Sequence, residues 1–262
     1  MRQTRISVRL FGRIEATNGN IIVRLPGRQT QALFALLCLD RRPRSREALA
    51  ADLWPEASSS SSASLRQALW LIRSGLLSAG VDPDEVLDID LDTIAVRSAA
   101  IDVDVDRFDR HVRATPRCPE AAVALYRGDL VEGLGHDVFA TERERLADDF
   151  EDMLSLAARQ QLADDNIDAA REAAQHLLAR DGLREEAHEV LIAVHGATGT
   201  RSQVVRQYRH LVDILRRELD VEPLPETVAV YRAALARTVA RSMDAAILDD
   251  YEPSRPVLVA TG

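Results

Sequence analysis

The sequence predicts a mainly α protein in two parts, an α+β domain over residues 1–100 and an all-α domain over residues 101–240. In the first part, two segments with strand periodicity enclose three segments with helical periodicity. After residue 101 the apolar spacing is helical almost throughout, and glycines mark the breaks. The length of 262 residues allows about two domains.

The charge of the chain is divided unevenly between these two parts. Residues 1–80 hold 12 arginines against five acidic residues, a net charge of +7. The remainder holds 21 arginines against 37 acidic residues, a net charge of −16. A basic first part joined to an acidic second part predicts that only the first part meets a polyanion such as DNA.

Strand periodicity opens the chain. Residues 6–11 alternate between apolar and polar side chains, and residues 14–17 and 21–25 repeat the pattern around Asn18-Gly19-Asn20. Because an Asn-Gly pair between alternating segments is typical of a tight hairpin turn, we expect a small antiparallel sheet over residues 5–25.

Three helices are predicted next. The first covers residues 28–39, and the second begins after Ser45 as its N-cap and ends near residues 53–55. The third covers residues 58–77, and helical spacing places four apolar side chains on one stripe: Leu65, Leu69, Ile72 and Leu76. The opposite side carries long polar, basic and aromatic side chains: Arg66, Gln67, Trp70 and Arg73.

A second hairpin closes the first part, with strands expected over residues 86–90 and 93–97. The order of sheet, three helices and hairpin is that of a winged helix with an additional N-terminal sheet. In such a fold the third helix lies in the major groove of DNA and the hairpin is the wing.

Seven helices are predicted in the second part, over residues 106–113, 120–126, 142–163, 167–180, 184–197, 201–219 and 225–237. Apolar positions recur at an offset of 34 residues: Ala170, Ala174 and Leu177 correspond to Val204, Tyr208 and Leu211. A helix-pair period of about 34 residues predicts an all-α tetratricopeptide-like domain, and the alternative is an ordinary helical bundle. Residues 241–262, which contain two prolines and no sustained period, are expected to form a flexible tail.

The third helix of the first part supplies the candidate DNA-binding residues. Arg66 and Arg73 suit the edge of guanine and Gln67 suits that of adenine. Trp70 either packs on a thymine methyl group or a sugar, or is buried at a domain interface. Three arginines before the second helix either neutralise DNA phosphates or form only a solvated basic loop: Arg42, Arg44 and Arg46.

No catalytic residue, metal ion or cofactor is expected. The aspartates that alternate over residues 88–92 and 102–106 resemble the start of a calcium loop, but the Gly and Glu that such a loop requires are absent. Both segments are therefore interpreted as solvated faces of strands. His188 and His195 are two helical turns apart, too far to share a metal directly, and no Gly-rich phosphate loop is found.

A series of short motifs runs through both parts in a consistent order. In the first part the motifs are VRLFG at 8–12, SREAL at 45–49, LWP at 53–55 and LRQAL at 65–69. In the second part they are IDVDVDRF at 101–108, ALYRGDL at 124–130, ERERL at 142–146, LREEAH at 183–188, QYR at 207–209 and ELDVEPLPET at 218–227. Over residues 6–237 the set resembles the SARP-type bacterial transcriptional activators, in which an OmpR-like winged helix precedes a bacterial transcriptional activator domain.

This resemblance implies a sequence-specific activator that binds direct repeats in promoters as a dimer, contacts RNA polymerase and has no enzymatic activity. In the family the loop at Trp54 faces the polymerase; the alternative is that Trp54 closes the core of the winged helix. Three positions depart from the family pattern. Leu71 and Ser74 stand where basic residues are usual, and Asp220 stands where Gly is usual.

We therefore expect a cytoplasmic transcriptional activator that binds double-stranded promoter DNA and acts as a homodimer, with no membrane partner. The helical domain would serve dimerisation, signal reception or contact with RNA polymerase. The alternative is a protein-interaction adaptor whose winged helix has weakened or lost DNA binding. The acidic residues of the second hairpin favour this alternative, because carboxylates repel phosphates, and the charge of +7 opposes it.

Overall fold

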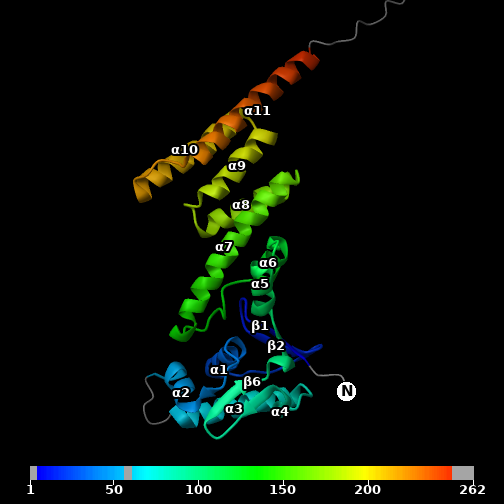
Figure 1. Ribbon diagram of the computed structural model, residues 1–262, viewed down its shortest axis with the longest axis vertical. Helices are drawn as coiled ribbons and strands as arrows, with labels where there is room; N and C mark the ends of the chain where they lie inside the picture. Colours follow the sequence, from blue (N-terminus) through cyan, green and yellow to red (C-terminus); the bar gives the residue numbers. More distant parts are fainter. Residues whose placement is uncertain (1–4, 56–60, 250–262) are drawn as a thin grey trace, which may run out of the picture. The chain divides into compact units, whose positions relative to one another are not determined.

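The computed structural model describes residues 5–55 and 61–249, with side chains through residue 241. The chain forms two compact units, Met1–Met153 and Leu154–Gly262 (Figure 1). Residues 58–60, predicted as helical, and residues 250–262 of the predicted tail lie outside the described residues. In the described part of the chain, no helix is long and apolar enough to cross a membrane.

A four-stranded sheet opens the first unit, with strand order β3-β2-β1-β7. Its strands are β1 (Ile6–Arg9), β2 (Glu15–Asn18), β3 (Ile21–Ile22) and β7 (Ile101–Val103). The predicted hairpin between β2 and β3 is confirmed, and Gly19 takes the positive φ of 58° that its tight turn requires. The sequence did not predict that β7 joins this sheet, where it pairs in parallel with β1. The domain boundary predicted at residue 100 thus lies within the first unit, just before β7.

The predicted winged helix follows the first three strands, with helices α1 (Arg28–Leu39), α2 (Arg46–Leu53) and α3 (Ser61–Ser78). The side chain of Ser45 caps α2, because its Oγ accepts a hydrogen bond from the Ala48 N–H at 3.1 Å. The wing is a three-stranded sheet of order β4-β6-β5, formed by β4 (Arg44–Ser45), β5 (Leu87–Ile89) and β6 (Thr93–Val96). A short helix, α4 (Pro83–Val86), precedes β5, and the side chain of Asp82 caps it.

Asp104 corrects the interpretation of residues 102–106 as a solvated face. Its side chain is 3% exposed at the start of α5 (Asp104–Arg113). Its carboxylate accepts hydrogen bonds from the backbone N–H groups of Leu10 at 2.9 Å, Phe11 at 3.1 Å and Val105 at 2.9 Å. Burial raises the pKa of the Asp104 carboxyl, although these three hydrogen bonds oppose the shift. The second predicted solvated segment, residues 88–92, is exposed or half-buried as expected.

An aromatic cluster joins the first sheet to the helices that follow it. Phe11 packs edge-on against Phe108 of α5 with ring centroids 5.2 Å apart, and Tyr126 stacks on Phe150 at 3.9 Å. Phe150 lies on α7 (Ala140–Ala163), and Tyr126 directly follows α6 (Pro119–Leu125). Two 3-10 turns, Ser98–Ala100 and Asp137–Phe139, complete the described elements of this unit.

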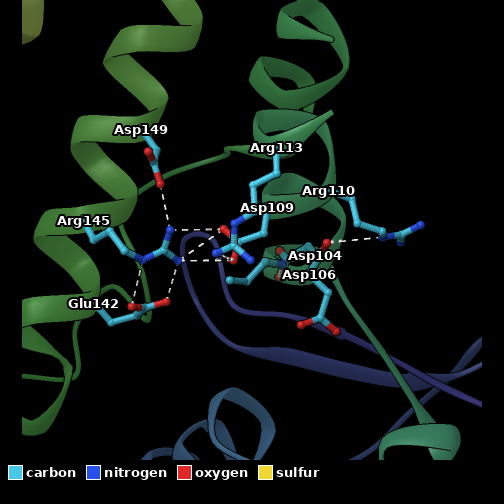
Figure 2. Close-up of polar contacts among 9 residues, drawn as sticks. Asp104, Asp106, Asp109, Arg110, Arg113, Glu142, Arg145 and Asp149 are labelled. Atoms are coloured by element: carbon cyan, nitrogen blue, oxygen red, sulfur yellow. Dashed lines mark hydrogen bonds and ion pairs between the residues drawn. The ribbon is translucent and has the colours of Figure 1, made fainter. Parts of the chain in front are cut away.

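An ionic cluster around Arg145 also connects α5 with α7. Figure 2 shows the Arg145 guanidinium between carboxylates of both helices, with contacts of 2.7 Å to Glu142, 2.7 Å to Asp149 and 3.2 Å to Asp109. Asp109 in turn binds Arg113 at 2.9 Å. The hydrogen bond to Glu142 is the main cause that raises the pKa of the Arg145 guanidinium. The cation therefore offsets the repulsion of three acidic side chains.

The second unit is all helical, as predicted. Its complete helices are α8 (Ile167–Arg180), α9 (Glu185–Thr198), α10 (Arg201–Leu219) and α11 (Pro225–Asp249). The starts of α8 and α10 lie 34 residues apart, and the repeated apolar positions face the interior. Tyr208 is half-buried and packs against the core, and the other five are fully buried: Ala170, Ala174, Leu177, Val204 and Leu211. These features confirm the tetratricopeptide-like fold. Helix α11 continues past residue 237, where the prediction ended it, into the predicted tail.

The turn between α10 and α11 places Asp220, one of the positions that depart from the family pattern, in a conformation that favours glycine. Asp220 follows α10 in the left-handed conformation, with φ 55° and ψ 39°. Glycine adopts this conformation at little cost, which accounts for the glycine usual at this position in the family. Glu185 of α9 then holds the start of α11, since its carboxylate accepts hydrogen bonds from the Leu224 N–H at 3.0 Å and the Thr227 hydroxyl at 2.7 Å.

Candidate nucleic-acid interface

Helix α3 is anchored to the first unit by its apolar stripe. Leu65, Ile72 and Leu76 are at most 2% exposed. Gly75 lies on the same side, where a Cβ atom would come within 2.2 Å of the carbonyl oxygen of Arg24. The helix backbone therefore packs directly against the chain after β3, which fixes the direction in which the opposite face of α3 points.

The opposite face of α3 is open to solvent and carries the predicted DNA-binding side chains. Arg66 and Gln67 are exposed, and the side chain of Trp70 is 64% exposed. Trp70 thus does not belong to the core of the first unit. Leu77, which the sequence analysis did not single out, extends this face and is 62% exposed. It follows Trp70 by seven residues, about two helical turns, so the helical period alone could have identified it.

Arg73 lies at the edge of the exposed face and has a partner in the protein. Its Nη1 donates to Asp84 Oδ1 at 2.7 Å, and its side chain is 38% exposed. A second acidic residue, Asp88 on strand β5 of the wing, binds Arg97 at 2.7 Å. Arginines on α3 and next to β6 therefore partly neutralise the acidic segment. The sequence analysis did not predict that Arg73 has a partner within the protein.

The three arginines predicted to contact phosphates are each engaged within the protein. Arg42 is 87% exposed and pairs with Asp40 at 2.9 Å, and this hydrogen bond is the main cause that lowers the pKa of Asp40. Two contacts hold the others: Arg44 binds Asp52 at 2.6 Å, and Arg46 Nη2 donates to the Asp90 carbonyl at 3.1 Å. Arg44 and Arg46 thus join α2 and the wing, and only Arg42 extends well into solvent.

Trp54 lies between two cavities and is half-buried. One cavity, of about 630 Å³, lies between α2 and α3 and is lined by Ala50, Leu65 and Arg66, among others. The other, of about 290 Å³, lies between the start of α1 and α3 and includes Gln67 in its wall. Trp54 therefore supports the helix that carries the candidate residues, and it also keeps a solvent-accessible edge.

The geometry of this face suits binding rather than catalysis. Its side chains are donors and an aromatic ring on one rigid helix, which can contact base edges in a groove. Among the residues with described side chains, no group of three or more His, Cys, Asp or Glu could hold a metal ion.

Comparison with known proteins agrees with this architecture. The family described as bacterial transcriptional activator domain matches residues 92–235. The solved structure of Mycobacterium tuberculosis EmbR in complex with low affinity phosphopeptide has the same fold, with a TM-score of 0.73 and 21% sequence identity over 95% of this chain and 72% of that chain. A comparison with curated proteins finds no match. Since the family match spans more than half of the sequence and confirms the predicted resemblance, the chain belongs to the bacterial transcriptional activator domain family and is a transcriptional regulator of that type.

Proposed function

We propose that the protein is a transcriptional activator that recognises promoter DNA by sequence through the exposed face of α3. In this proposal the winged helix over residues 1–100 binds double-stranded DNA. The helical domain over residues 101–240 contacts RNA polymerase or a second copy of the chain, as the family resemblance implies. Such a protein works in the cytoplasm and requires no cofactor and no chemistry of its own.

The observation that carries the proposal is the two-sided character of α3. One side is locked into the core, and the other presents Arg66, Gln67 and Trp70 to solvent. Among the residues with described side chains, neither Arg66 nor Gln67 has a hydrogen-bonding partner, so their donors are available to a ligand. Arginine and glutamine make bidentate contacts with guanine and adenine, and a rigid helix orients them well.

The proposal is tested by fluorescence anisotropy with purified full-length protein. A duplex enriched by the protein from a random library is compared with a scrambled duplex of the same composition, and both are titrated with salt. We expect tighter binding to the enriched duplex and a steep negative slope of log affinity against log salt, since counterions are released from phosphates. The substitution Arg66→Ala should weaken specific binding by about 1–3 kcal/mol.

A matched control separates this contact from the loss of positive charge. Arg13 is an exposed arginine in the turn between β1 and β2 and is not part of α3. Arg13→Ala removes the same charge and should preserve the preference for the enriched duplex. Equal loss of specificity in both variants, or none in Arg66→Ala, would contradict the role of α3.

A protein-interaction adaptor is the second candidate. The engagement of Arg44 and Arg46 by Asp52 and the Asp90 carbonyl favours it, because it removes two expected phosphate contacts. Under this alternative, Trp70 and Leu77 would contact a protein partner. Folded protein that enriches no DNA sequence, and whose anisotropy signal stays flat at low salt, would contradict the activator and favour the adaptor.

A further inference from the structure

Asp84 lies beside the exposed face of α3 and binds an arginine of that face. Its carboxylate accepts one hydrogen bond from Arg73 Nη1 at 2.7 Å. The side chains of Asp84 and Arg73 are 73% and 38% exposed, so the ion pair is open to solvent. Exposed pairs of this kind contribute little to stability. Its main effect is therefore on the position and charge of Arg73.

The backbone that carries Asp84 is held firmly. The N–H of Asp84 donates to Asp82 Oδ1 at 3.0 Å, and its carbonyl accepts from Arg97 Nε at 3.2 Å. Val86, in the same short helix, is fully buried and anchors α4. Arg97 is itself held by Asp88 at 2.7 Å. The carboxylate of Asp84 thus extends from a fixed support and restricts where the guanidinium of Arg73 can lie.

The contact with Asp84 occupies only part of the guanidinium. Within the part of the chain whose side chains are described, Arg73 Nε and Nη2 have no hydrogen-bond acceptor. Two adjacent N–H groups are what a bidentate contact with guanine requires. The carboxylate also offsets the positive charge of Arg73, which reduces its attraction to any phosphate regardless of sequence.

We propose that Asp84 is a specificity-determining residue of the DNA interface, which orients Arg73 toward a base edge and withholds its charge from the phosphates. The proposal rests on the proposed DNA-reading role of α3. It predicts opposite effects when Asp84 is lost. Binding to random DNA becomes tighter because Arg73 can reach a phosphate, and preference for the specific sequence declines because the guanidinium is no longer oriented.

The test measures the affinity of Asp84→Ala for the enriched and the scrambled duplex over a range of salt concentrations. We expect the salt slope for the scrambled duplex to steepen by about 0.9, which corresponds to one added phosphate contact. The ratio of specific to scrambled affinity should fall on the order of tenfold. Asp84→Asn removes the charge and keeps an acceptor oxygen, so it should steepen the slope and retain more of the ratio.

Glu222→Ala is the matched control, because it removes the same charge from an exposed pair with Arg216 in the second unit, outside the proposed interface. It should leave the ratio unchanged. In an Arg73→Ala background, Asp84→Ala should also leave the ratio unchanged, since its effect passes through Arg73. The proposal is overturned if Asp84→Ala keeps the wild-type slope and ratio, or if Glu222→Ala alters the ratio equally. If the wild-type protein enriches no sequence at all, the proposed function fails first and the role of Asp84 fails with it.

Discussion

The buried carboxylate of Asp104 should be one of the main polar supports of the first unit. It accepts hydrogen bonds from two backbone N–H groups at the end of β1, those of Leu10 and Phe11, and both residues are at most 3% exposed. Asp104→Ala would leave both donors without an acceptor in a place that water does not reach. Each buried, unsatisfied donor costs about 1–3 kcal/mol.

The expected loss of stability is smaller than the summed cost of the two unsatisfied donors. Burial of the carboxylate is itself unfavourable, as the raised pKa of Asp104 indicates, and its removal returns part of the cost. We therefore expect Asp104→Ala to lower the free energy of unfolding by about 2–4 kcal/mol. Asp104→Asn keeps one acceptor oxygen and turns an amide NH2 toward one of the donors. It should therefore lower the free energy of unfolding by about 1–3 kcal/mol.

Tryptophan fluorescence is well suited to this measurement. The chain has two tryptophans, Trp54 and Trp70, and both lie in the first unit. Urea unfolding followed by their fluorescence therefore reports on the unit that contains Asp104. If the free energy of unfolding depends on urea concentration with the same slope in both proteins, a shift in the unfolding midpoint measures a change in stability.

Asp102→Ala is the control for this experiment. Asp102 lies two residues away on β7 and is half-buried, and no described residue donates a hydrogen bond to its carboxylate. Its substitution should change stability by less than about 0.5 kcal/mol. If Asp104→Ala proved as stable as Asp102→Ala, the reasoning from the unsatisfied Leu10 and Phe11 donors would be refuted.

Three further predictions follow from single positions. Gly75→Ala should destabilise the first unit by about 1–3 kcal/mol in the same assay, because the new methyl group would meet the Arg24 carbonyl. Gly135→Ala should be neutral, because its methyl group would meet only ordinary contacts. Equal stability of the two variants would contradict the close packing of α3. Asp220→Gly should stabilise the second unit by about 0.5–1 kcal/mol in thermal unfolding followed by circular dichroism, since it relieves a left-handed aspartate at the end of α10, and a decrease would contradict this. The pKa of Asp104 is higher in the folded than in the unfolded chain. The free energy of unfolding should therefore fall as pH rises from the ordinary aspartate pKa through the raised value. Asp104→Asn should remove this pH dependence from the fluorescence-detected midpoint.

Features with a local cause were predictable from the sequence. The bounds of α1, α8 and α10 agree with the predicted helices to the residue, because apolar periodicity and the turn residues at their ends are encoded within each segment. The β2–β3 hairpin follows from a single Asn-Gly turn, and the wing from two alternating segments on either side of Leu91-Asp92. The 34-residue repeat was visible in apolar positions for the same reason.

Features that depend on distant partners were not predictable. Strand β7 exists because Ile101 and Val103 pair with Ile6 and Val8 near the other end of the unit. Asp104 looked like part of a solvated aspartate pattern, and only the approach of the β1 end turns it into a buried acceptor.

The candidate site divides in the same way. The exposed face of α3 follows from its period, whereas the partners of Arg44, Arg46 and Arg73 come from other elements.

The central claim is that the exposed face of α3 recognises DNA by sequence. The most direct test is selection from a random duplex library, with sequencing, by the wild-type protein and by Arg66→Ala under identical salt. We predict that the wild-type protein enriches a defined motif and that Arg66→Ala loses its preference at one or two positions of that motif while retaining the rest. An identical motif with identical preferences from both proteins, or no enrichment by folded wild-type protein, would contradict the claim.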